Sequence, residues 1–150
     1  MVTTTDDPLQ LERQVCFALA VANRSVLGIY RPLLEPLGLT HPQYLVMLAL
    51  WGEAPMSVKA IGEAVQLDSP TLSPLLKRLE SAGYITRRRS DSDERNLQID
   101  LTDSGTALRE KALEIPPAVV DRLGVSLADL EELHAVLTRV NNAALGRTPK

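Results

Sequence analysis

Residues 68–101 read DSPTLSPLLKRLESAGYITRRRSDSDERNLQIDL, and this stretch decides the predicted fold. Asp68 can cap a helix whose first turn holds a proline, and Gly83 can end that helix. Between them, the leucines at positions 72, 75, 76 and 79 recur with the helical period and form one apolar stripe. The pattern predicts an amphipathic helix from Ser69 to Ala82.

Two short strands are predicted directly after this helix. They cover residues 84–88 and 97–101, and the second strand alternates, with Leu97, Ile99 and Leu101 facing inward. The polar residues 90–96 between the strands predict a hairpin loop. Two short capped helices followed by a hairpin are typical of a winged helix-turn-helix.

Three more helices are predicted before this stretch. A long helix begins at about residue 8 and ends near residue 31, because Pro32 disfavours helical geometry in the residue before it. Thr40 and Gln43 resemble a capping box that opens an apolar helix through about residue 51. Ser57 then caps a short helix that ends near residue 65.

Two helical segments are predicted after the hairpin. Thr102 caps a helix that must bend or break at Pro116 and Pro117, and Ser126 caps a last helix that ends before Gly146. The predicted fold is therefore mainly α with a small β-hairpin wing. We expect a single domain, residues 1–150, with its winged-helix unit at about 55–101.

The composition excludes several classes of protein. Aromatic residues make up only 3% of the 150 residues, so the core must be mainly aliphatic, which suits packed helices. No apolar run reaches the length of about 18 residues that a membrane span requires. The polar residues 1–8 are unlike a secretory signal, and a single cysteine cannot form an internal disulfide. We expect a cytoplasmic protein that has no contact with a membrane.

No cofactor is predicted. One cysteine and two histidines far apart in the sequence, His41 and His134, do not have the spacing of metal ligands.

Basic side chains gather in one part of the chain. The net charge is −3, but between residues 77 and 89 the only acid is Glu80. A basic patch on an acidic body is typical of a protein that binds DNA through one face. Arg95, beside carboxylates at the hairpin tip, can enter a minor groove. From the residues alone, an ordinary amphipathic surface helix and a solvated charged turn remain as alternatives.

Three stretches resemble the MarR family of winged-helix regulators: DSPTLSPLLKRLE at 68–80, GYITRR at 83–88 and DSDER at 91–95. The resemblance implies a homodimer, formed through helices at about 8–53 and 103–145, on a double-stranded, pseudo-palindromic DNA operator. It also implies DNA contacts by small, polar or basic side chains of the helix and by charged side chains of the wing. With the neighbouring residues of the same surface, the predicted set is Ser69, Pro70, Thr71, Ser73, Lys77, Arg78, Arg87, Arg88, Arg89, Asp93 and Arg95.

Three further stretches are similar to the organic-hydroperoxide-sensing branch of that family: LERQVCF at 11–17, YRPLL at 30–34 and THPQYL at 40–45. This branch surrounds a reactive cysteine near the start of the first helix with tyrosines. The resemblance implies a redox-sensing set of Cys16, Tyr30, His41 and Tyr44. Two residues depart from the branch pattern, because Ala20 and His41 stand where it commonly has tyrosines.

The spacing of Cys16 and Tyr30 indicates how such a sensor is assembled. The 14 residues between them span about 21 Å in one straight helix, so Tyr30 cannot activate the cysteine of its own helix. It can reach the Cys16 of a partner if the first helices cross in a two-fold dimer. Because the chain has no second cysteine, reversible oxidation requires a small external thiol, giving a mixed disulfide, or a backbone nitrogen.

These observations predict a transcriptional repressor, not an enzyme, that leaves its operator when an organic hydroperoxide oxidises Cys16. The first alternative is a repressor relieved by a small aromatic ligand, in which Cys16 is structural. The second alternative is a thiol peroxidase that turns over Cys16.

Overall fold

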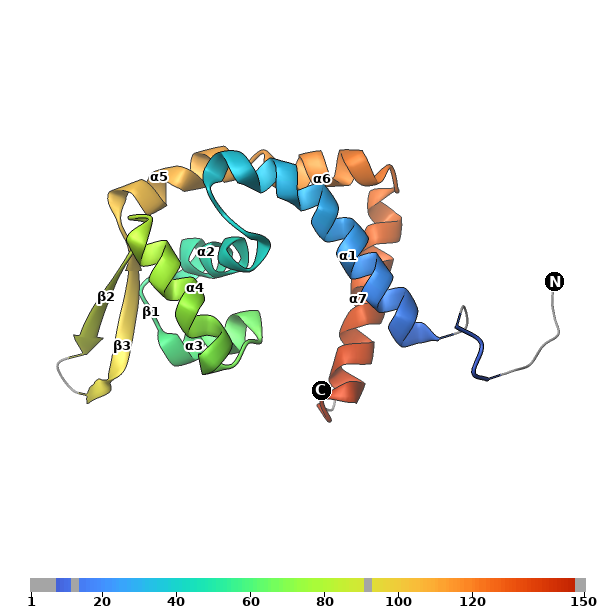
Figure 1. Cartoon of the computed structure of the whole chain (residues 1–150), viewed down its shortest axis with the longest axis horizontal. Helices are drawn as coiled ribbons and strands as arrows, with labels where there is room; N and C mark the ends of the chain where they lie inside the picture. The colour runs from blue at the N-terminus through green and yellow to red at the C-terminus, as the bar shows by residue number, and fades with distance from the viewer. Residues whose placement is uncertain (1–7, 12–13, 91–92, 148–150) are drawn as a thin grey trace. The chain divides into compact units, whose positions relative to one another are not determined.

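The computed structural model describes residues 8–11, 14–90 and 93–147, with backbone only at residues 90 and 93–96. Figure 1 shows a mostly helical chain with one small sheet, which confirms the predicted fold class. In chain order the elements are α1 (Val15–Leu34), η2 (Glu35–Leu37), α2 (His41–Glu53), β1 (Met56–Ser57), α3 (Val58–Val65), α4 (Ser69–Ser81), β2 (Ile85–Ser90), β3 (Asp93–Leu101), α5 (Asp103–Ala112), α6 (Ile115–Leu123) and α7 (Leu127–Ala144).

The chain divides into two compact units, residues 1–115 and 116–150. The first unit has one hydrophobic core, to which α4 contributes its leucine stripe. Leu72, Leu76 and Leu79 are each 1% exposed, so the predicted buried face of this helix is confirmed. They share the core with side chains from α1, α2, α3 and the sheet: Leu34, Val46, Met47, Leu50, Ile61, Ile85 and Ile99.

The helix starts predicted from capping residues are confirmed, apart from that of the first helix. The hydroxyl of Thr40 accepts a hydrogen bond from the backbone N–H of Gln43, whose side-chain oxygen accepts one from the N–H of Thr40. Asp68 caps α4 through the N–H of Thr71. The hydroxyls of Ser57, Thr102 and Ser126 cap α3, α5 and α7 in the same way.

The prediction for the first helix was wrong at both ends. Gln14, whose side chain donates to the carbonyls of Pro8 and Gln10, is the N-cap, and the helix begins at Val15. Leu11 and Val15 are exposed, so neither of these two side chains packs in a way that would stabilise an earlier turn. At the other end the helix continues past the proline at position 32 to Leu34, whose side chain is buried.

The sheet is larger than predicted. Its strands are antiparallel in the order β1-β3-β2, and β1, a strand of two residues, was not predicted. Residues 93–96 belong to β3, so the predicted loop at 90–96 was too long. Backbone hydrogen bonds form between strands whether the side chains are polar or apolar. The pairing of β2 with β3 therefore extends through the polar residues, with an irregularity between Arg89 and Ser90, to the pair Ser90 and Asp93.

The break at the two prolines is confirmed, and it produces an additional helix. α5 ends at Ala112, and α6 begins at Ile115 with Pro116 and Pro117 in its first turn, where a missing N–H is harmless. In the second unit, α7 has no buried residue and exposes apolar side chains at Leu127, Leu133, Val136 and Val140, and its C-cap residue Leu145 is exposed as well.

None of the helices in the described part of the chain combines the length and the apolar character needed to cross a bilayer.

Gly105, in the first turn of α5, should be the glycine least tolerant of a side chain. A Cβ at this position would overlap the backbone carbonyl of Tyr84, at the start of the hairpin. We expect Gly105→Ala to destabilise the chain by about 1–3 kcal/mol, the usual cost of overpacking a core. Urea denaturation measures this change.

Gly52→Ala is the matched control. Gly52 also lies in a helix, but a Cβ there would meet nothing within 4 Å, so the substitution should stabilise by roughly 0.5–1 kcal/mol. Equal effects of the two substitutions would contradict the close approach of α5 to Tyr84.

Candidate functional site

α4 presents a polar face opposite its leucine stripe. Its N-terminal half exposes small and hydroxyl-bearing side chains, and Lys77 and Arg78 follow one turn later. Pro74 lies inside α4, which continues through it without interruption. A hydrogen bond from Thr71 to Asp68 lowers the pKa of this carboxyl, which therefore stays charged at the helix N-terminus. The exposed side chains predicted to contact DNA are Ser69, Pro70, Thr71, Ser73, Lys77 and Arg78.

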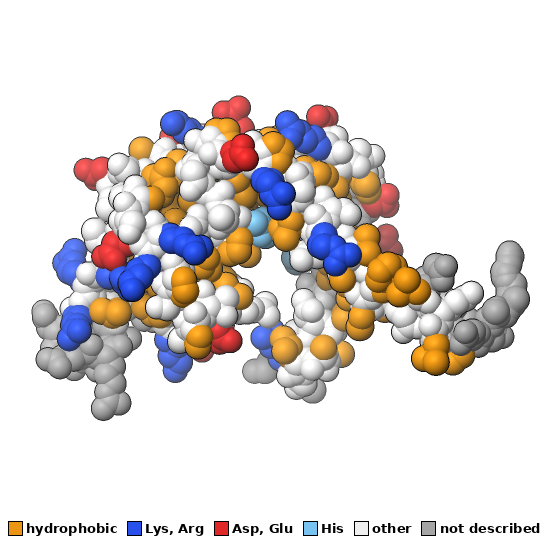
Figure 2. Space-filling view, viewed as in Figure 1, with side chains coloured by type: hydrophobic (Ala, Val, Ile, Leu, Met, Phe, Trp, Pro, Cys, Tyr) orange, Lys and Arg blue, Asp and Glu red, His pale blue; other side chains and the backbone are white. Residues whose placement is uncertain are grey.

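The β2–β3 hairpin carries the arginines of the predicted wing. Arg88 and Arg89 are exposed, whereas the guanidinium of Arg87 binds one carboxylate oxygen of Glu80 on α4 at 2.9 and 3.0 Å. Arg87 therefore ties the hairpin to α4. Figure 2 shows basic side chains over the region of α4 and the sheet. Asp93 and Arg95 lie in β3, but their side chains are outside the described part of the structure, so their role stays a prediction.

Three rings of the predicted sensor lie together where α1 and α2 meet. The ring of Tyr30 contacts that of His41 edge-on, with 4.8 Å between centroids, and lies 5.9 Å from the ring of Tyr44. The capping box places His41 at the first position of α2, facing α1. Tyr44 is buried, and the other two rings are half-buried. We call Tyr30, His41 and Tyr44 the ring cluster.

Burial keeps the ring cluster uncharged. Burial raises the pKa of Tyr30. It also raises the pKa of Tyr44, and repulsion between the ionised forms of Tyr44 and Tyr30 raises that pKa further. Burial lowers the pKa of His41. At neutral pH the cluster therefore offers two phenol hydroxyls and a neutral imidazole, all of which can donate a hydrogen bond.

Cys16 lies away from the ring cluster of its own chain. It is exposed in the first turn of α1, and Tyr30 follows it by 14 residues on the same helix, a distance of about 21 Å along the axis. Val15, Phe17 and Leu19, which lie beside it on α1, are 66%, 40% and 38% exposed, so the described part of the helix around Cys16 exposes apolar side chains. The structure thus brings together three of the four predicted sensing residues and leaves the fourth apart.

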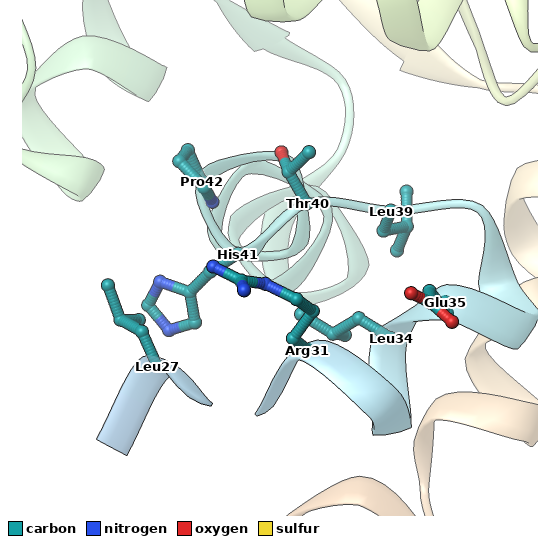
Figure 3. A pocket seen from close by; sticks show the side chains of 8 residues that line it. All are labelled: Leu27, Arg31, Leu34, Glu35, Leu39, Thr40, His41 and Pro42. Carbon is teal, nitrogen blue, oxygen red and sulfur yellow. The ribbon is translucent and has the colours of Figure 1, made fainter. Parts of the chain in front are cut away.

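A pocket of about 400 Å³ opens beside the ring cluster. Figure 3 shows side chains of α1 on one side of it and His41 with its neighbours on the other. Most of the lining is apolar, but Arg31 and Glu35 place charges at it. The full lining is Leu27, Arg31, Leu34, Glu35, Leu39, Thr40, His41 and Pro42.

No group of three or more potential metal ligands of the His, Cys, Asp and Glu types was found among the residues that the structure describes.

Comparison with known proteins identifies the family. A family model described as transcriptional regulator SarA/Rot matches residues 28–112, more than half of the chain. The organic hydroperoxide resistance transcriptional regulator of Bacillus subtilis (strain 168) is 45% identical over 131 residues, which cover 87% of this chain and 89% of that one. The chain belongs to the organic-hydroperoxide-sensing branch of the MarR family.

Solved structures agree with this membership of the MarR family. The structure of reduced AbfR bound to DNA has a TM-score of 0.80 at 35% identity, and the match covers 91% of this chain and 93% of that one. The disulfide form of AbfR has a TM-score of 0.63 at 35% identity, with 91% and 90% covered. AbfR comes from Staphylococcus epidermidis. The present MarR-family chain is thus a DNA-binding transcriptional regulator with a winged helix.

Sequence reasoning missed several residues around the sites of this MarR-family regulator. Arg31 stands in the quoted YRPLL stretch, but nothing in the one-dimensional pattern places it at a pocket with Glu35. Glu80 was noted only as an isolated acid, because its pairing with Arg87 runs across the turn between α4 and β2. Arg87 was predicted to face DNA, and its bond to Glu80 indicates a positioning role as well.

The lowered pKa of His41 predicts a pH dependence of stability. Because folding disfavours the charged imidazole, the unfolded state gains more protons as the pH falls. The stability that this residue contributes should be fully present above its ordinary pKa of about 6.5 and lost as the pH drops below it. Thermal unfolding from about pH 7.5 to about pH 5.5 should show a smaller loss of stability in His41→Gln than in the wild type.

His134→Gln is the control for the pH experiment, because His134 is an exposed histidine of α7 outside the ring cluster. Identical pH profiles of wild type and His41→Gln would contradict the buried, neutral imidazole.

The exposed cations of α4 and β2 predict how operator binding responds to salt. Lys77→Gln and Arg88→Gln should each weaken binding and reduce the slope of log Kd against log salt by about 1, as expected for a lost phosphate contact. Lys111→Gln, at an exposed position of α5, is the control that should keep the slope. An unchanged slope in both test variants would remove α4 and β2 from the DNA interface.

Proposed function

We propose that this chain is a homodimeric repressor that leaves its operator when an organic hydroperoxide oxidises Cys16. The position of Cys16 carries the proposal: it is exposed on an apolar surface of α1, about 21 Å along the helix from its own ring cluster. The identity of 45% to an organic hydroperoxide resistance regulator supports the choice of oxidant.

A two-fold dimer accounts for the apolar surfaces that the single chain exposes. Phe17, Leu19 and Val21 on α1 are 36–40% exposed, and α7 with its C-cap Leu145 exposes five more large apolar side chains. Exposed apolar surface on this scale is typical of a protein interface. In a two-fold dimer every contact is reciprocal, so each Cys16 can meet the ring cluster of the partner subunit.

The oxidation step is a two-electron transfer from sulfur to the peroxide. The Cys16 thiolate attacks one hydroperoxide oxygen, an S–O bond forms and the O–O bond breaks. Sulfur is oxidised to sulfenic acid, and the leaving alkoxide takes a proton to become an alcohol. Tyr30 is suited to orient the peroxide, because its raised pKa keeps the hydroxyl protonated. A small thiol then condenses with the sulfenic acid, which releases water and leaves a mixed disulfide.

The repressor leaves DNA because oxidation adds a polar oxygen or a bulky thiol to Cys16, at a position that is packed in the dimer. In the reduced dimer, the α4 helices enter successive major grooves of a pseudo-palindromic operator and the wings reach the flanking minor grooves. Oxidation of Cys16 disturbs the dimer contacts of α1 and favours an arrangement in which the two α4 helices no longer fit both half-sites.

The pocket beside His41 favours a second candidate function. Its volume of about 400 Å³ is within the range of small-molecule sites, so a small aromatic molecule is the alternative signal. In that mechanism Cys16→Ser would respond to the inducing ligand as the wild type does, and hydroperoxide would leave both proteins on DNA.

Replacement of the cysteine tests the proposed function directly. Cys16→Ser should bind the operator within about threefold of the reduced wild type, because only the sulfur is replaced, by a smaller oxygen that adds no bulk at this position. Hydroperoxide should weaken operator binding by the wild type at least tenfold and leave Cys16→Ser unchanged. Gel shifts give the affinities, and intact-mass spectrometry follows Cys16. A variant that is still released by hydroperoxide would refute the mechanism.

Mixed dimers test whether the site is shared between subunits. A dimer of one Cys16→Ser subunit and one Tyr30→Phe subunit keeps one complete site if Cys16 works with the partner's Tyr30. If both residues acted within one subunit, no complete site would remain. We expect the single Cys16 of this mixed dimer to react at the wild-type rate; oxidation of that cysteine as slow as in the Tyr30→Phe homodimer would contradict the shared site.

A further inference from the structure

A long-range hydrogen bond joins the wing to the segment that connects the two helices of the ring cluster. The hydroxyl of Tyr84, the residue before β2, donates to the backbone carbonyl of Leu37 at 3.0 Å, across 47 positions of sequence. The bond is partly buried, and the side chain of Leu37 is only 7% exposed.

The acceptor lies between the elements that hold the ring cluster. Leu37 is the last residue of η2, which continues directly from α1 and Tyr30. After Leu37 the chain turns at Gly38, whose φ of 73° is left-handed, and Thr40 then caps α2 at His41. Any shift of α1 against α2 at the ring cluster therefore moves the carbonyl that Tyr84 holds.

The donor is fixed to the DNA-binding elements by its own backbone. The N–H of Tyr84 donates to Leu79 on α4, and its carbonyl accepts from the N–H of Thr102 at the end of the wing. Gly105 of α5 lies so close to the backbone carbonyl of Tyr84 that a Cβ at position 105 would overlap it. Tyr84 is thus held by the C-terminal turn of α4, the base of the hairpin and the first turn of α5.

We propose that the Tyr84–Leu37 hydrogen bond transmits the redox signal from the ring cluster to α4 and the wing. Tyr84 is then a positioning residue, and the inference rests on the proposed function. The physical basis is that the hydrogen bond couples the two segments it joins. If the segment at Leu37 or the one at Tyr84 is displaced, the other must move with it; otherwise the bond breaks and the partly buried carbonyl of Leu37 is left unpaired. Neither the reduced affinity nor the chemistry at Cys16 depends on this hydroxyl.

Tyr84→Phe tests the transmission, because it removes the hydroxyl and keeps the ring. Operator Kd should be measured for the reduced and the hydroperoxide-treated homodimer of each protein, with the extent of Cys16 oxidation read from intact mass in the same samples. We expect the reduced variant to bind within about threefold of the wild type and Cys16 to be oxidised equally. The ratio of oxidised to reduced Kd should fall about three- to tenfold, the usual effect of one lost hydrogen bond.

Trp51→Phe is the matched control for a purely structural effect. The indole N–H of Trp51 donates to the carbonyl of Gly105 at 2.9 Å, another long-range bond of an aromatic side chain, but one that ends on α5 instead of the connecting segment. It should lower the melting temperature without changing the Kd ratio.

The outcomes separate the two proposals. If Tyr84→Phe kept the wild-type Kd ratio, or changed it only as much as Trp51→Phe does, the transmission role would be overturned while the proposed function stood. If the wild type itself showed no change of Kd after Cys16 was oxidised, the proposed function would fail, and the transmission role with it.

Discussion

Burial of the α4 leucines is the constraint on which the DNA-binding half of the molecule depends. Leu72, Leu76 and Leu79 are almost completely removed from solvent, and burial of each contributes about 1.5–3 kcal/mol. Because these side chains fix the rotation of the helix about its own axis, the opposite face must carry the small and basic residues outward. The bond between Arg87 and Glu80 then sets the hairpin against the same helix. One hydrophobic core therefore positions both α4 and the hairpin.

A second constraint separates the sensor into two parts. Helical geometry holds Cys16 and Tyr30 at opposite ends of α1, and no side-chain rotation spans about 21 Å. The hydrogen-bond donors of its own ring cluster therefore cannot reach Cys16. Dimerisation would bring donors to it, so that assembly and reactivity depend on the same contact.

The sequence predicted those features that local physics determines. Capping residues such as Thr40 and Ser57 satisfy backbone N–H groups within one turn, so their positions alone predicted where helices begin. The leucine stripe of α4 is equally local, since its period identifies a buried face whatever the partner is.

Features that depend on residues far apart in the chain could not be predicted from the sequence. β1 has two residues, and only its pairing of Met56 with Ile99 makes it a strand. The start of α1 was placed too early because capping residues alone cannot show whether a first turn has anything to pack against. The hydrogen bond of Tyr84 and the pocket at Arg31 join segments far apart in the chain. The resemblance to the hydroperoxide-sensing branch predicted the four sensing residues. Only the structure showed that three of them lie together within one chain.

The histidine in the ring cluster narrows the possible chemistry of the site. A histidine can act as a hydrogen-bond donor or, as imidazolium, attract a thiolate. The half-buried position of His41 beside two tyrosines lowers its pKa, because burial disfavours the charged form. The neutral imidazole can donate one hydrogen bond through one ring nitrogen, much as the hydroxyl of a tyrosine would. His41 can therefore donate a hydrogen bond, as the tyrosine common at this position in the branch would, and burial disfavours a positive charge on its ring at neutral pH.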